Sequence, residues 1–77
     1  MDTAAFLRQF ENAIEGLTPG SMRPETVLRE LPQWDSLALL NILAMVDMEY
    51  GVQVSGLEIQ ACRTLQDLAD LVGRKRG

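Results

Sequence analysis

One serine stands where a helix is expected to begin, in the segment Trp34-Asp35-Ser36-Leu37. The first backbone N–H groups of a helix are unpaired and its dipole is positive there, so a serine at this place can hold a phosphodiester. Asp and Ser are also favoured helix caps, so the same residues fit a plain cap. The segment offers no base to activate the hydroxyl of Ser36, so a separate transferase would have to modify it.

Other residue types that could do chemistry are scarce, because the chain has one cysteine, Cys62, and no histidine. A disulfide within the chain, a Cys/His zinc site and a nucleophile paired with histidine are therefore excluded. Cys62 occupies an apolar position, and we expect it to be a buried structural thiol. We predict no catalytic and no metal-binding residue, since a chain of 77 residues also has little room for a deep enzymatic pocket.

Acidic residues dominate the charge. The formal net charge is -4, but residues 1–73 hold four basic and eleven acidic groups, a net of -7. Such a domain repels nucleic acid and anionic lipid and attracts partners with basic patches. The other basic residues lie in 74–77, which we expect to be a flexible solvated tail. Nothing resembles a signal peptide or a membrane span, which predicts a cytoplasmic protein without membrane contact.

Four helical segments and no strong strand signal predict an all-α fold. We expect one domain over residues 1–77, a small four-helix bundle of three longer helices and one short helix. The expected ranges are about 3–17, 36–50, 56–61 and 64–73, with Gly51 and Gly73 ending the second and fourth helices. Asp2 or Thr3 can cap the first helix.

The first helix is one-sided. Its apolar residues fall within an arc of about 120°: Phe6, Leu7, Phe10, Ala13, Ile14 and Leu17. Arg8, Glu11, Asn12 and Glu15 occupy the opposite side, which we expect to face solvent.

A long loop, roughly residues 18–34, joins the first and second helices. It contains three prolines, and its apolar residues Val27, Leu28 and Leu31 can hold it against the bundle. A connection of this length lets the two helices run closer to parallel than a short hairpin would.

The second helix is apolar on two sides. With Ser36 at zero, a core stripe lies between about 240° and 340° on the helical wheel: Leu39, Ile42, Leu43, Val46 and Tyr50. A second set lies between about 40° and 120°, and we call it the docking strip: Leu37, Leu40, Ala44 and Met48. One stripe suffices to reach the core of a small bundle, which favours the docking strip as an interface. The alternative is that the first or last helix covers it.

The segment from Trp34 to Val72 resembles the acyl carrier protein family. The shared order is Asp-Ser-Leu, an apolar helix, Glu49-Tyr50-Gly51, a Val-x-Val stretch, a short helix, and Thr64-Leu65 at the start of the last helix. The resemblance extends over roughly residues 3–73.

This resemblance implies a carrier module that separate enzymes modify and use. Ser36 would bear a covalent 4′-phosphopantetheine arm from coenzyme A, whose thiol carries acyl groups as thioesters. Partners would be a phosphopantetheinyl transferase and acyl-activating, acyltransferase or ketosynthase-type enzymes, acting on a monomer. The residues expected to contact them are Asp35, Leu37, Leu40, Ala44, Asp47 and Met48.

The chain also departs from the family members that serve fatty acid synthesis. Their second helix is usually strongly acidic, whereas the matching positions here are Ala38, Asn41 and Asp47. Trp34 is also not the commonest residue before the motif. Both features favour a dedicated secondary-metabolite, polyketide-like or polysaccharide-modification pathway over housekeeping fatty acid synthesis.

Two alternatives stay open. One is an aminoacyl or peptidyl carrier, although such carriers usually approach the serine through a glycine-rich segment and Gln33-Trp34-Asp35 is not one. The other is a helical adaptor that carries nothing, in which Ser36 is only part of a helix cap.

Overall fold

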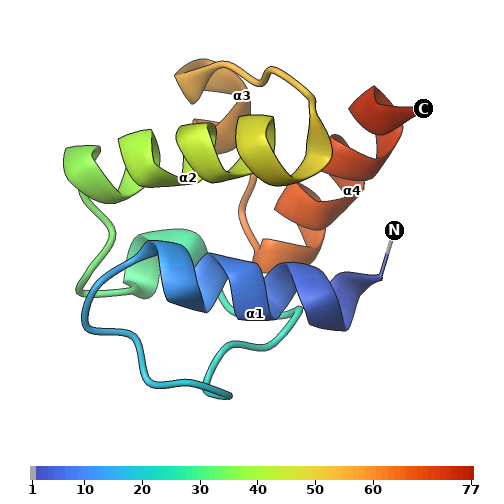
Figure 1. Ribbon diagram of the computed structural model, residues 1–77. Helices are drawn as coiled ribbons and strands as arrows, with labels where there is room; N and C mark the ends of the chain where they lie inside the picture. The colour runs from blue at the N-terminus through green and yellow to red at the C-terminus, as the bar shows by residue number, and fades with distance from the viewer. Residues whose placement is uncertain (1) are drawn as a thin grey trace.

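The computed structural model describes residues 2–77, which form four α-helices and one short 3-10 helix (Figure 1). The elements are α1 (Thr3–Ala13), η1 (Leu28–Glu30), α2 (Ser36–Tyr50), α3 (Gly56–Gln60) and α4 (Leu65–Arg76). The predicted all-α bundle with a long first loop is confirmed. None of the helices in the described residues is long and apolar enough to cross a membrane.

Helix α1 begins at its expected cap and ends early. The Oδ1 atom of Asp2 accepts a hydrogen bond from the Ala4 N–H at 3.0 Å. The predicted end at Leu17 is wrong, because Ile14 already has extended backbone angles and Gly16 has a φ of +90°. Ile14 is buried and Leu17 packs against the core, so the apolar pattern continues into the turn although the helix does not.

Glu11 was predicted to face solvent, and this prediction is wrong, because the residue is only 7% exposed. Its two carboxylate oxygens accept hydrogen bonds from the backbone N–H groups of Gly20 and Met22, each at 2.9 Å. The loop after α1 folds back over this carboxylate, which satisfies two donors that would otherwise lack partners. A helix wheel cannot show that the following segment will cover one side of the helix.

The long loop extends from the end of α1 to the start of α4, where it is hydrogen-bonded, and then turns back to the start of α2. The Leu28 N–H donates to the Arg63 carbonyl and the Leu65 N–H donates to the Thr26 carbonyl, each at 3.0 Å. At the base of the loop the Gln33 side chain donates to the Gly16 carbonyl at 3.2 Å. Because the two loop ends meet, α1 and α2 run in opposite directions, and the expected tendency toward parallel is wrong (Figure 1).

The buried side of α2 is rotated from the predicted stripe. Its buried residues are Ala38, Ile42, Met45 and Val46, which span about 180° to 280° on the same wheel. The predicted core residues Leu39, Leu43 and Tyr50 are only partly buried. The rotation fits the packing of α1 beside Met45, whereas Gly56 of α3 lies next to Leu39.

Helix α4 begins as expected but continues past Gly73 to Arg76. Thr64 and Asp67 form a capping box, with the Thr64 N–H donating to Asp67 at 3.1 Å. The last turn has tertiary contacts: Lys75 pairs with Glu58 at 2.9 Å, and the Arg76 guanidinium lies 5.7 Å from the Tyr50 ring centroid. These contacts offset the roughly 1 kcal/mol that glycine costs inside a helix. Residues 74–76 therefore belong to α4 and not to a tail.

Candidate functional site

Ser36 is the first residue of α2, and its side chain is exposed. Asp35 is the N-cap, and its Oδ1 atom accepts a hydrogen bond from the Ala38 N–H at 2.8 Å. Among the described residues the backbone N–H groups of Ser36 and Leu37 have no hydrogen-bond partner. The expected position of the serine is confirmed, and two unpaired donors lie beside its hydroxyl.

The chain is held in place just before this serine. The Trp34 N–H donates to the Leu31 carbonyl at 3.0 Å, and its indole stacks on the buried Phe10 ring of α1. Trp34 therefore packs the end of the loop onto the bundle. Packing of Trp34 leaves Asp35 and Ser36 at the surface.

The docking strip lies open on α2. Leu37, Leu40 and Met48 are 65%, 61% and 82% exposed, and Ala44 is exposed as well. Within residues 2–77 no other helix covers these side chains, so the alternative of a covered strip is wrong. Asp47, at the edge of the strip, is also exposed. An uncovered row of large apolar side chains is typical of a surface that meets another protein.

Leu57 on α3 is 80% exposed, and the sequence patterns did not predict it as a surface residue. Its neighbour Ile59 is fully buried, and residues two apart in a helix point to nearly opposite sides. The short helix around them begins with a capping box between Ser55 and Glu58, which was also missed. The serine with a glutamate three residues later was the signal that could have located both features.

Only a few carboxylates lie exposed around the docking strip. Ala38 is buried, so that position is not part of the recognition surface. Glu58 is engaged by Lys75, whose hydrogen bond lowers the pKa of the Glu58 carboxyl below its usual value. Asp35, Asp47 and Glu49 remain exposed on or beside α2.

Cys62 is buried, as predicted, and its thiol lies 3.5 Å from the Glu58 carbonyl oxygen. Burial raises the pKa of the Cys62 thiol, which keeps it protonated at neutral pH and unreactive. Within residues 2–77 no group of three or more potential metal ligands is close enough to hold an ion.

The geometry at Ser36 fits a phosphodiester on its hydroxyl. The unpaired N–H groups of Ser36 and Leu37 and the positive end of the α2 dipole favour an anion there. The exposed hydroxyl is accessible to a modifying enzyme.

Comparison with known proteins supports this chemistry. Residues 6–72 match the model of a family described as phosphopantetheine attachment site. The fold is similar to the solution NMR structure of a holo acyl carrier protein from Geobacter metallireducens, with a TM-score of 0.75 and 27% sequence identity over 95% of this chain and 83% of that chain. No curated protein matches the sequence. The chain therefore belongs to the phosphopantetheine attachment family as an acyl carrier protein, a non-catalytic domain with a covalent 4′-phosphopantetheine arm.

Proposed function

We propose that Ser36 bears the arm. The observation that carries this proposal is its exposed hydroxyl at the first position of α2, beside two unpaired backbone donors. The other serines differ: Ser55 accepts the Glu58 N–H in a capping box, and Ser21 donates to the Thr18 carbonyl.

Attachment is a phosphoryl transfer. The Ser36 oxygen attacks the phosphorus of coenzyme A that bears pantetheine, the bond from that phosphorus to the bridging oxygen breaks, and adenosine 3′,5′-bisphosphate leaves. The chain has no histidine to take the hydroxyl proton, so a base of the transferase accepts it. The N–H groups of Ser36 and Leu37 then stabilise the phosphodiester charge. When attached, the arm supplies the thiol that holds an acyl group as a thioester.

The docking strip, together with Asp35 and Asp47, is the proposed contact surface for the transferase and for acyl-activating, acyltransferase or ketosynthase-type enzymes. Its support is the exposure of Leu37, Leu40 and Met48 on the helix that begins with Ser36. Apolar side chains at the centre of an interface supply most of its binding energy, whereas exposed carboxylates mainly steer a basic partner.

We place the chain in a dedicated biosynthetic pathway and not in housekeeping fatty acid synthesis. The support is the small number of acidic residues on α2, where Ala38 is buried and Asn41 is neutral. The second candidate is an aminoacyl carrier, whose cargo would bring a positive charge to this acidic domain. In both cases the chain acts as a cytoplasmic monomer.

Intact mass tests the assignment. Treatment with coenzyme A and a broad-specificity phosphopantetheinyl transferase should add one arm of about 340 Da to the wild-type chain and none to Ser36→Ala. Ser55→Ala is the matched control, since it also removes a serine from a helix start, and it should still gain the arm. An arm on Ser36→Ala would place the attachment elsewhere, and no arm on the wild type would favour a helical adaptor.

A further inference from the structure

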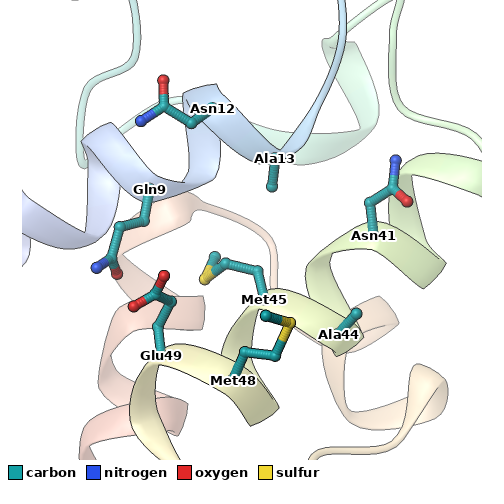
Figure 2. A pocket seen from close by; sticks show the side chains of 8 residues that line it. All are labelled: Gln9, Asn12, Ala13, Asn41, Ala44, Met45, Met48 and Glu49. Atoms are coloured by element: carbon teal, nitrogen blue, oxygen red, sulfur yellow. The ribbon is translucent and has the colours of Figure 1, made fainter.

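A cleft of about 390 Å³ lies between α1 and α2 (Figure 2). Gln9 and Ala13 line it from α1, and Met45 and Glu49 line it from α2. We call it the interhelix cleft. Ala44 of the docking strip borders it as well, so a protein that covers the strip also covers the cleft. Its volume reaches the range of sites that bind small ligands.

Two oxygen acceptors without a donor lie at one end of the interhelix cleft. The Oε1 atom of Gln9 is buried and has no hydrogen-bond partner among residues 2–77. The Glu49 carboxylate is exposed and forms no ion pair in the same part of the chain. The two side chains point toward each other (Figure 2). A buried oxygen without a partner costs free energy, so a donor supplied by another molecule would be bound favourably here.

The lining next to these acceptors is apolar. Met45, whose side chain is buried, and Ala13 line the cleft between the two helices. A methionine thioether adapts its shape to the methylene stem of a neighbouring side chain. A group that fits the cleft must therefore combine an apolar stem with several hydrogen-bond donors at its end.

The charge of the domain favours a cation in this place. Residues 1–73 carry a net charge of -7, which attracts positive groups. The guanidinium of arginine has five N–H donors in a planar fork, so it can pair with the Glu49 carboxylate and donate to the Gln9 oxygen at once. The ammonium of lysine is more strongly hydrated and offers no such fork. A hydrocarbon would leave the Gln9 oxygen unpaired.

We propose that the interhelix cleft receives one arginine side chain of a partner protein, with the guanidinium between Gln9 and Glu49 and the stem along Met45. The inference rests on the proposed use of α2 as a contact surface, but it does not require the arm. The occupant comes from a protein because the cleft opens beside Ala44 of the docking strip, where an interface would place the partner's own residues. Through Gln9, α1 becomes part of the contact surface and determines which partners fit.

The test uses the chain without its arm and an arginine with blocked ends, so that only the side chain of the probe carries charge. N-acetyl-L-arginine amide is titrated into the chain while backbone and side-chain amide NMR shifts are recorded. We expect shifts of the Gln9 side-chain amide and of the backbone amides of residues 9–13 and 45–49, with a dissociation constant in the millimolar range. N-acetyl-L-citrulline amide, which has a neutral urea in place of the guanidinium, should bind about fivefold more weakly.

Matched variants separate the two acceptors. Gln9→Leu and Glu49→Gln should each weaken the binding of the arginine probe about fivefold, the value of roughly one hydrogen bond. The controls are Gln60→Leu, at an exposed position on α3, and Glu25→Gln, at an exposed position in the long loop, and both should bind as the wild type does. Circular dichroism verifies that each variant is folded. Because Glu49 is exposed, Glu49→Gln tests the inference even where Gln9→Leu weakens the fold.

Unchanged amide shifts, equal binding of the arginine and citrulline probes, or wild-type binding in a folded Gln9→Leu or Glu49→Gln variant would overturn the inference. Free L-arginine that binds about tenfold more tightly than the blocked residue would overturn it too, because the cleft would then be a site for a small molecule. These outcomes leave the carrier function intact. Failure of the wild-type chain to gain the arm would instead contradict the proposed function.

Discussion

The indole of Trp34 stacks on the ring of Phe10, with centroids 6.1 Å apart and planes inclined by 22°. Phe10 belongs to α1 and is fully buried, and Trp34 is two residues before Ser36. This contact therefore fixes where α2 begins relative to α1, and with it the position of the proposed attachment site. A loop of this length would otherwise leave that position loosely determined.

Trp34→Ala should lower the free energy of unfolding by about 2–3 kcal/mol, less than a fully buried tryptophan because the side chain is partly exposed. Arm transfer to Ser36 should slow as well, because the loop end loses its anchor. Trp34→Phe keeps a stacked ring and should recover most of both losses. Urea unfolding and the rate of mass gain measure the two effects, and unchanged values in Trp34→Ala would show that the stacking does not position the serine.

Leu40→Glu should leave the helical content and the unfolding midpoint nearly unchanged, because the Leu40 side chain is 61% exposed. It should slow arm transfer by about tenfold or more, since a charge enters the proposed apolar contact with the transferase. Circular dichroism and transfer kinetics measure these outcomes, with Leu40→Met as the control that keeps the surface apolar. Loss of folding in Leu40→Glu would mean that the docking strip is part of the core.

Glu11→Ala should lower the free energy of unfolding by about 2–4 kcal/mol, because it leaves the N–H groups of Gly20 and Met22 without their acceptor. Hydrogen exchange of these two amides should accelerate more than that of amides in α2. Glu15→Ala removes an exposed carboxylate from the same segment and should have little effect. Equal exchange rates in the two variants would contradict a role for Glu11 in holding the loop.

The free energy of unfolding should decrease at acid pH, because Glu58 and Asp67 become protonated. The hydrogen bond from Lys75 lowers the pKa of Glu58 below its ordinary 4.5, and the Thr64 N–H lowers the pKa of Asp67 below its ordinary 3.8. The unfolded chain therefore binds these protons more readily than the folded one. The stabilisation is present above the ordinary pKa values and is lost as the pH falls through the lowered ones.

Glu58→Gln should therefore be less stable than the wild type at about pH 7, with the difference shrinking toward about pH 3. Urea unfolding across this range measures it. Glu25→Gln is the control, since Glu25 is exposed and forms no ion pair in residues 2–77. A difference that persists at low pH would mean that the Glu58–Lys75 pair does not cause the pH dependence.

Local chemistry made several features predictable. The range of α2 follows from Asp35, which caps its first turn, and from Gly51, whose φ of +67° ends it at little steric cost. Thr64 and Asp67 begin α4 in the same local way. The exposure of the docking strip followed from counting apolar faces against the few helices available to cover them. Such features depend on residues within a few positions of one another, so the sequence by itself determines them.

Contacts between segments far apart in the sequence determine the features that the sequence did not predict. Gly73 ends no helix because Lys75 meets Glu58 and Arg76 meets Tyr50, while Glu11 is buried because the loop at Gly20 and Met22 folds over it. The antiparallel course of α1 and α2 depends on the loop ends meeting at Gly16 and Gln33. Local sequence preferences cannot predict these contacts, because the contacts stabilise the chain only when segments far apart in the sequence are packed together.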